Sequence, residues 1–262
     1  NKLIYFVNNG IHPGEPCGID ASMMWVRDLL QSDRRQKILE KTVILLIPVY
    51  NVGGALNRSA FSCANQNGPK LYGFRGNARN LDLNRDFIKC DSKNAQSFNR
   101  FFSRLKPDLF IDTHTSNGSD YQHTMTYIAS MEDRMPQSQQ HLLYDTLIPT
   151  LERGMQKKGW NIVPYVYARD NPRKGIYEFD DSPRYSSGYA ALHYSLAFIS
   201  ETHMLKPFDQ RVKSTYDLLD HLLKAGIEYK MSIHRAKEKA IQDDNELTSF
   251  PIKYTLDRDV AD

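Results

Sequence analysis

Short apolar runs rich in β-branched and aromatic residues alternate along this 262-residue chain with longer stretches in which apolar residues recur at helical spacing. This alternation is typical of α/β proteins, in which helices cover a largely parallel sheet. The runs that predict extended structure are 3–7, 42–50, 108–113, 123–129, 162–168 and 195–200, with a further edge strand at 250–256. The stretches that predict helices are 19–31, 92–105, 138–158, 185–193 and 208–243.

Two parts of the sequence depart from this alternation of strands and helices. Glycine weakens a helix interior, so we expect the last helix to bend or break near Gly226. Residues 51–91 lack a clear period and contain many Asn and Gly residues. A long irregular stretch inside a compact domain is usually functional. No internal repeat or linker divides the chain, and we therefore expect a single α/β domain over residues 1–262.

Charge and cysteine content exclude several classes of protein. The 34 Lys and Arg residues nearly balance the 31 Asp and Glu residues, for a net charge of +3. That charge is too small for a protein that binds nucleic acid or a membrane surface through bulk charge. The longest aliphatic run, 43–47, is far too short to span a bilayer. Three cysteines without a CxxC pair are too few for a disulfide scaffold. We expect a soluble protein without a nucleic-acid partner or a membrane span, either cytoplasmic or, if a signal peptide has been removed, periplasmic or secreted.

Three of the predicted strands lead directly into residues that can bind a metal or transfer a proton. The first strand is followed by His12 and Glu15, the strand that begins at residue 108 by His114, and the strand that begins at residue 195 by Glu201. Because sites in open α/β sheets form outside the carboxyl ends of the strands, these side chains can converge. The sequence therefore predicts a functional site at this edge of the sheet.

His12 and Glu15 are the first candidate metal ligands. Pro13, Gly14 and Pro16 force a tight, non-helical turn around them, in which both side chains can reach one ion. Zinc binds imidazole nitrogen and carboxylate oxygen, and a catalytic zinc site keeps its fourth position open for water. A His and a Glu three residues apart also fit an ordinary solvated loop, so the pair needs a third ligand to indicate zinc.

His114 is the best-placed third ligand, and Asp112 on the same strand face would orient its imidazole ring. His123 is the rival ligand, ranked second because it begins a strand rather than ending one. Without a metal, His114 fits equally well as a neutral core histidine that is hydrogen-bonded to the backbone.

Glu201 is the candidate general base. It follows an apolar strand directly, and a carboxylate in such surroundings needs either a partner or a raised pKa. Both conditions suit a base near a metal-activated water. The alternative is a structural salt bridge, and His203 is the rival base.

The loop over residues 74–87 contains three arginines and three asparagines. Arginine pairs with carboxylates through two parallel hydrogen bonds, and asparagine adds neutral donors, so the loop predicts an anion-binding surface. A basic loop is more often only a solvated face. The aromatic residues Tyr72, Phe74 and Phe87 favour a loop that is packed against the domain.

In combination and order, these motifs resemble those of the zinc carboxypeptidase family of the carboxypeptidase A/B type. The matching motifs are His12-x-x-Glu15, Asp82-Leu83-Asn84-Arg85, His114 after a strand and Glu201 at a late strand end. The similarity covers residues 2–205. It implies a mixed, mostly parallel, eight-stranded sheet flanked by helices. It also implies one zinc ion per chain bound by His12, Glu15 and His114, with Glu201 as general base.

The resemblance also implies roles for residues that bind substrate. Asn84 and Arg85 match the pair that holds the terminal carboxylate, and Arg75 matches the arginine that polarises the scissile carbonyl. Tyr185 is the first choice for the family's active-site tyrosine, ahead of Tyr177 and Tyr189. The dipeptide Pro13-Gly14 departs from the digestive members, which carry an arginine in that gap.

The resulting functional hypothesis is hydrolysis of a C-terminal peptide bond by a zinc-bound water. The substrate would be a peptide with a free carboxylate. The first alternative is a zinc-dependent deacylase of N-acyl amino acids similar to succinylglutamate desuccinylase or aspartoacylase, because those enzymes share the same core motifs. The turn after Glu15, over residues 16–21, favours the peptidase. A third alternative is a catalytically inactive peptide-binding module.

Overall fold

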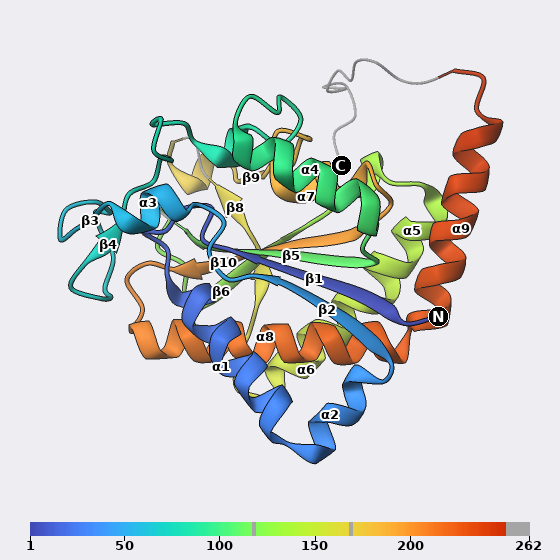
Figure 1. The fold of residues 1–262 in the computed structure, drawn as a ribbon, viewed down its shortest axis with the longest axis horizontal. Helices are drawn as coiled ribbons and strands as arrows, with labels where there is room; N and C mark the ends of the chain where they lie inside the picture. The colour runs from blue at the N-terminus through green and yellow to red at the C-terminus, as the bar shows by residue number, and fades with distance from the viewer. Residues whose placement is uncertain (117–118, 168–169, 250–262) are drawn as a thin grey trace.

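The computed structural model describes residues 1–116, 119–167 and 170–249. At its centre is a six-stranded sheet with the strand order β2-β1-β5-β10-β6-β7 (Figure 1). The strands are β1 (Leu3–Asn9), β2 (Thr42–Ile47), β5 (Leu109–Ser116), β6 (Met125–Ala129), β7 (Val163–Pro164) and β10 (Leu196–His203). Neighbouring strands are parallel except at the β10–β6 pair. The predicted α/β class, with a mixed and mostly parallel sheet, is confirmed.

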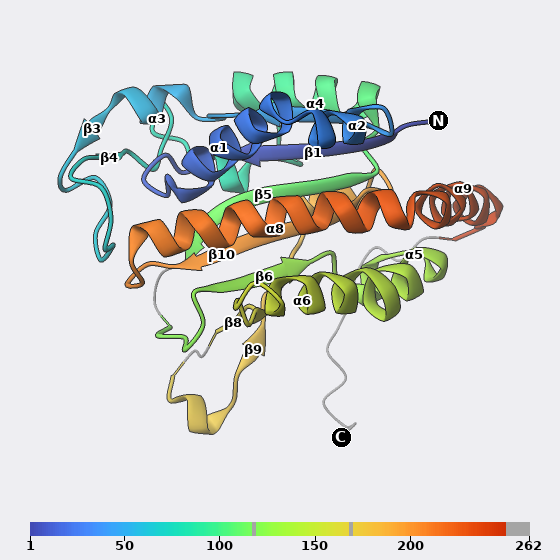
Figure 2. The same ribbon diagram turned by 90° about the horizontal axis from the view of Figure 1, so that it is seen from below.

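Helices cover both faces of this sheet (Figures 1 and 2). One face carries α4 (Lys93–Leu105) and α7 (Ser186–Ala191), and the other carries α1 (Cys17–Gln31), α6 (Ile148–Gln156) and α8 (Phe208–Glu228). The remaining helices are α2 (Asp33–Leu39), α3 (Val52–Leu56), α5 (Gln137–Leu142) and α9 (Lys230–Glu246), with a π-helical turn at Leu143–Leu147 between α5 and α6. Short 3-10 turns occupy Leu83–Arg85, Glu132–Arg134 and Pro172–Lys174.

Alternation of side chains along the strands divides the core in two. Phe6 and Phe110 pack towards α4, whereas Tyr5, Leu109 and Ile111 belong to the cluster under α1 and α8. Successive residues of a strand point to opposite faces, so a strand covered on both sides must be apolar at every position. This explains why the strand sequences read as continuous apolar runs rather than as alternating ones.

The helix start predicted at Ser92 is confirmed, because the Ser92 hydroxyl accepts a hydrogen bond from the Ala95 N–H at 3.0 Å. The break predicted near Gly226 is confirmed and lies three residues further along the chain. Helix α8 continues to Glu228, and the chain turns at Tyr229 before α9 begins. A Cβ at Gly226 would lie 2.4 Å from Leu109 Cδ1, so this glycine allows the helix to approach the sheet closely.

The predicted count of eight strands is wrong for the described residues. Two further extended segments, β8 (Val166–Tyr167) and β9 (Tyr177–Glu178), pair with each other instead of extending the main sheet. Another two-stranded ladder joins β3 (Arg58–Ser59) to β4 (Tyr72–Gly73). The main sheet ends at β7, where only two residues pair with β6 and Pro164 has no N–H to donate. The edge strand predicted at 250–256 lies outside the described residues.

None of the helices within the described ranges combines the length and hydropathy that crossing a bilayer requires.

Candidate active site

The turn after β1 brings His12 and Glu15 to the carboxyl edge of the sheet. Gly10 has a φ of +66°, a conformation that favours glycine, and the Glu15 N–H closes the turn on the His12 carbonyl at 2.9 Å. A Cβ at Gly14 would lie 2.9 Å from both the Cys63 Cβ and the Gly73 carbonyl oxygen. The arm that carries β3 and β4 therefore packs directly on this turn. No larger side chain fits at Gly14, which accounts for part of the departure at Pro13-Gly14.

His114 joins these two residues from β5. It lies inside the strand rather than past its end, as does Glu201 in β10, so the sequence-based strand ends were too short. The Glu15 carboxylate lies between the two rings, with Oε1 3.0 Å from His12 Nδ1 and Oε2 2.9 Å from His114 Nδ1. The Thr115 N–H also donates to Glu15 Oε2 at 3.0 Å. All three side chains are buried, with exposed fractions of 4% for His12, 7% for Glu15 and 3% for His114.

The other nitrogen of each ring faces a second carboxylate. His12 Nε2 is 3.0 Å from Asp82 Oδ1, and His114 Nε2 is 3.0 Å from Asp112 Oδ2. The Ser186 hydroxyl donates to the same Asp112 oxygen at 2.6 Å. The predicted contact of Asp112 is thus present, whereas sequence reasoning assigned no role to Asp82 or Ser186. Its position in the motif with Asn84 and Arg85 could have marked Asp82 as a site residue. Nothing in the local sequence predicts that Asp82 contacts His12.

This donor set fits a zinc ion. One ligand atom from each of His12, Glu15 and His114 lies within 4.8 Å of the others. Two imidazoles and one carboxylate are ligands that zinc prefers, and carboxylates behind the imidazoles hold the rings so that the Nδ1 lone pairs can face a metal. The structure thus brings together the three ligands predicted from the sequence, and the rival ligand His123 is not part of this cluster.

The Glu15 carboxylate and the two imidazole groups change one another's pKa values. Burial opposes ionisation of Glu15, but the charge of His12 and the hydrogen bonds of both histidines hold the pKa of Glu15 well below its usual range. Burial likewise opposes the charged imidazoles, yet the adjacent carboxylates raise the pKa of both His12 and His114. A concentration of negative charge around two imidazoles favours a cation among them.

Glu201 lies next to His114 in the β10–β5 register. Burial, reinforced by the charge of Glu15 and opposed by that of His114, raises the pKa of Glu201 to about 7. A carboxyl group with a pKa near neutrality can both accept and release a proton at that pH. The rival base His203 is held elsewhere, because its Nε2 is 2.9 Å from Asp120 Oδ1 and its Nδ1 accepts the Leu205 N–H.

A hollow of about 120 Å³ connects Glu201 with the substrate-binding candidates. Its lining includes His12, Glu15, Arg75, Asn84, Arg85, His114, Tyr165, Phe179, Tyr185 and Glu201. The structure therefore places every site residue that was predicted from the sequence around one cavity. A second hollow of about 260 Å³ borders the same metal cluster and extends towards Cys63, Gln66 and Met204.

Arg75 and Arg85 lie in this cavity with different partners. Arg75 Nε donates to Asp82 Oδ2 at 3.0 Å, and its Nη1 is 3.6 Å from Glu15 Oε1. Arg85 donates from Nη1 to the Asn84 carbonyl at 2.7 Å, and it forms no ion pair with any carboxylate of the described residues. Arg85 is therefore free to bind a carboxylate from outside the protein.

Tyr185 is the tyrosine that faces the predicted carboxylate-binding pair. The Arg85 Cζ atom lies 4.8 Å from the centre of its ring. Tyr189 instead packs in the core between Phe87 and Phe102, and Tyr177 pairs with Tyr167 in the β8–β9 hairpin. The geometry favours Tyr185 over both rivals.

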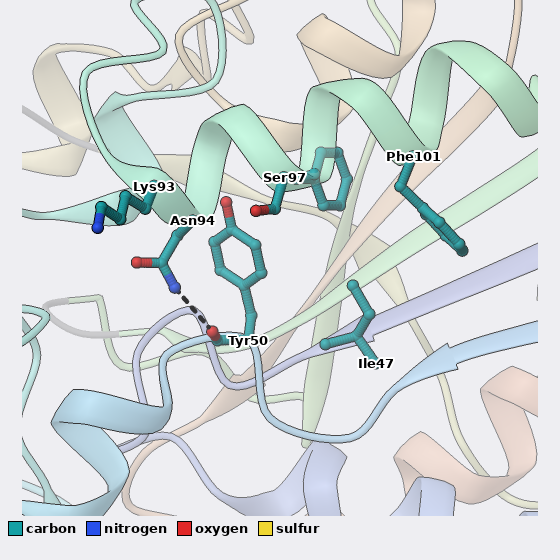
Figure 3. Close-up of a pocket in the computed structure, with 7 residues that line it drawn as sticks. Ile47, Tyr50, Lys93, Asn94, Ser97 and Phe101 are labelled. Carbon is teal, nitrogen blue, oxygen red and sulfur yellow. Dashed lines mark hydrogen bonds between the residues drawn. The ribbon is translucent and has the colours of Figure 1, made fainter.

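A larger cavity of about 580 Å³ lies elsewhere, between the end of β2 and helix α4 (Figure 3). Ile47, Phe98 and Phe101 make it mainly apolar, and the Asn94 side chain donates to the Tyr50 carbonyl across it. The described residues that line this cavity include no histidine, cysteine or carboxylate.

Comparisons with known proteins agree with this geometry. The sequence profile described as zinc carboxypeptidase matches residues 1–144. No curated protein matches the chain. Among solved structures, a metallo-carboxypeptidase from Pseudomonas aeruginosa superposes with a TM-score of 0.63 at 17% identity, covering 89% of this chain and 58% of its own. A metallo-carboxypeptidase from Burkholderia cenocepacia gives 0.63 at 14% identity, covering 86% and 57%.

A third solved structure shows the same likeness. Carboxypeptidase A from Helicoverpa armigera superposes with a TM-score of 0.59 at 14% identity, covering 92% of this chain and 62% of its own. At such identities the superpositions show a shared fold. This chain spans less than two thirds of the length of each of these three structures.

Proposed function

From the premise that this chain belongs to the zinc carboxypeptidase family, we propose that it hydrolyses the C-terminal peptide bond of a peptide with a free carboxylate, using one zinc ion per chain. The match of the zinc carboxypeptidase profile to residues 1–144 confirms the family predicted from the sequence. The observation that carries the proposal is the shared cavity. In it lie a candidate metal cluster, a carboxyl group whose pKa is about 7 and an arginine that forms no ion pair with the described residues.

His12, Glu15 and His114 would hold the zinc ion. When bound, zinc supplies Lewis-acid chemistry, which polarises a carbonyl group and lowers the pKa of water. Asp82 and Asp112 keep the two imidazole rings in position for it.

Glu201 acts as the general base of the proposed reaction. It accepts a proton from the attacking water and delivers it to the amine that leaves when the peptide bond breaks. Its pKa of about 7 suits both steps, because the group is neither too weak a base nor too weak an acid at neutral pH. Arg75 lies close to Glu15 and donates to the developing charge on the scissile carbonyl oxygen.

Asn84 and Arg85 hold the terminal carboxylate of the substrate. Asn84 and Arg85 line the same cavity, where the Asn84 side-chain NH2 group and the Arg85 guanidinium can donate to a carboxylate, and Arg85 forms no ion pair with a carboxylate of the described residues. A fixed terminal carboxylate orients the last peptide bond, and that bond alone, for attack.

The test compares two substrate classes and one variant. Hippuryl peptides with a free terminal carboxylate should be hydrolysed, and N-acetyl and N-succinyl amino acids should not. Arg85→Ala should lower kcat/KM on the free-acid peptides by about 10- to 150-fold, because a hydrogen bond to a charged group contributes about 1.5–3 kcal/mol. The loss should be much smaller with C-terminally amidated peptides.

Arg79→Ala is the matched control, because Arg79 is an exposed arginine of the same loop and does not line the cavity. Turnover of the N-acyl amino acids alone would establish the deacylase instead. A zinc-loaded protein without turnover of either class would establish a peptide-binding module. Equal losses on free-acid and amidated peptides would contradict the role of Arg85.

A further inference from the structure

The cavity that contains Arg85 shares part of its wall with a second hollow of about 360 Å³. The two hollows share the side chains of Tyr165, Phe179 and Tyr185, and the outer one is also lined by Tyr167, Asp180, Ser182 and Arg184. The hairpin of β8 and β9, which supplies part of this lining, projects beside the end of the molecule that carries the site (Figure 2). A terminal residue held at Arg85 would therefore lie beside the aromatic side chains that border both hollows.

The ring of Tyr185 contacts two guanidinium groups, those of Arg85 and Arg184. The Arg85 Cζ atom is 4.8 Å from the centre of its ring, and the Arg184 Cζ atom is 5.6 Å from the same centre. The two cations therefore lie no farther apart than the sum of these distances. Phe179 packs edge-on against the Tyr185 ring with 4.8 Å between ring centres, which keeps the ring in place.

Arg184 is a solvent-exposed cation that lines the outer hollow. The Asp180 carboxylate, which lines the same hollow, is paired with Arg134 at 2.7 Å. Arg184 forms no ion pair with a carboxylate of the described residues. A cation–π contact leaves the N–H edge of a guanidinium group free to bind a carboxylate.

The backbone beneath Arg184 is held firmly. The Tyr185 N–H donates to the Ser182 carbonyl at 2.9 Å, which closes a turn around Arg184. A Cβ at Gly188 would lie 2.5 Å from the carbonyl oxygens of both Asp181 and Ser182, so the first turn of α7 packs directly on this segment. Arg184 and Tyr185 thus extend from a segment that cannot shift freely.

We propose that Arg184 binds a side-chain carboxylate on the substrate's C-terminal residue, so that the protein prefers peptides ending in glutamate or aspartate. This inference rests on the proposed carboxypeptidase function. Arg85 would hold the α-carboxylate and Arg184 the side-chain carboxylate, while the aromatic walls contact the methylene groups between them. An aromatic terminal residue would fit the walls but would leave the Arg184 charge without a partner.

The experiment measures kcat/KM for hippuryl-Glu, hippuryl-Gln, hippuryl-Phe and hippuryl-Lys. The wild-type protein should favour hippuryl-Glu over hippuryl-Gln by about 10- to 150-fold, the range expected for hydrogen bonds to a charged group. Arg184→Gln should bring this ratio close to one. Arg184→Glu should reverse the charge preference, so that hippuryl-Lys is hydrolysed faster than hippuryl-Glu.

Arg173→Gln is the matched control, because Arg173 is an exposed arginine of the same part of the chain and lines neither hollow. It should keep the wild-type ratio. A second readout is calorimetric binding of hippuryl-Glu and hippuryl-Gln to Glu201→Gln protein, in which the affinity ratio should again depend on Arg184.

The possible failures are distinguishable. If none of the hippuryl peptides is hydrolysed, the proposed function is wrong and this inference falls with it. If they are hydrolysed with no preference for glutamate, or if Arg184→Gln keeps the wild-type ratio, only the role of Arg184 is overturned.

Discussion

Two groups of side chains border neighbouring hollows and differ in how their charges are paired. The first, here called the metal cluster, is His12, Glu15 and His114, and the second, here called the arginine pair, is Arg85 and Arg184. Every ring nitrogen of the metal cluster faces a carboxylate of the protein, and all three side chains are nearly inaccessible. The arginine pair forms no ion pair with the described residues and contacts the ring of Tyr185 instead.

This difference indicates that the metal cluster is preorganised, whereas the arginine pair is suited to recognise a ligand. Carboxylates behind the imidazoles hold the metal cluster in one geometry before anything binds, as a catalytic centre requires. Apart from the Arg85 Nη1 donor that binds the Asn84 carbonyl, the arginine pair keeps its donors for a ligand, and we expect a substrate with carboxylates to supply the opposite charge. The predictions that follow test the two halves of this contrast, beginning with the largest expected effect.

Removing one member of the metal cluster should abolish its function. We expect His114→Ala to lose stoichiometric zinc, measured by elemental analysis of the purified protein, together with all turnover. The variant should also be less stable, by about 1–3 kcal/mol, because Glu15 and Asp112 lose a buried hydrogen-bonding partner. His123→Ala, which changes a histidine outside the cluster, should keep its zinc. The reverse pattern of zinc loss would refute the ligand assignment.

Glu201→Gln should leave zinc and substrate binding in place, because the amide keeps the shape of the side chain. Turnover should fall by about 10²- to 10⁴-fold, the range typical of general acid–base catalysis. Steady-state kinetics and zinc analysis on the same preparation check both statements. His203→Gln serves as the comparison, since His203 is engaged with Asp120 and Leu205. Near-native turnover in the first variant and none in the second would show that the base is His203.

Asp82→Asn tests whether the carboxylate that contacts His12 Nε2 contributes to zinc affinity. The amide oxygen can still accept the Asn84 N–H, but the charge that supports His12 is lost. Zinc affinity, measured by competition with a chelator, should fall about 10- to 100-fold. Asp91→Asn, at an exposed position near the same loop, should not change it. Unchanged affinity in Asp82→Asn would mean that the preorganisation inferred for His12 is unimportant.

The segment that carries Arg184 contains a buried carboxyl group at Asp181. Burial outweighs the nearby Ser187 hydroxyl, Gly188 N–H and Arg134 charge, and raises the pKa of Asp181 to about 7. The unfolded chain therefore releases this proton at lower pH than the folded protein does, so folding stability falls as the pH rises from about 4 to about 7.

Asp181→Asn cannot ionise, so its stability relative to the wild type should rise over that pH interval and show no further gain above it. Urea denaturation of both proteins at pH 4, 5.5 and 7.5 measures the difference, in which the titration of other groups cancels. The exposed Asp170→Asn should show no such trend. A constant difference between wild type and Asp181→Asn across the three pH values would contradict the raised pKa.

Much of the site was visible in the amino-acid sequence because its chemistry is carried by residue types at short spacing. His12 and Glu15 fall in one proline-bounded turn, and Asn84 and Arg85 are adjacent. His114 and Glu201 were found because each ends an apolar run, although the structure shows that both strands continue past them. Strand ends are poorly marked in the sequence where polar residues replace apolar ones within the strand.

The sequence by itself determined the α/β class, because strands covered on both faces must be apolar throughout and helices covered on one face must be apolar at every third or fourth position. It also indicated the candidate metal ligands. Only the tertiary structure decided that Asp82 supports His12, that Gly226 allows α8 to approach Leu109, and that Arg184 shares a ring with Arg85. These contacts join residues through packing across the fold, and no spacing or periodicity along the chain records which distant side chains will meet.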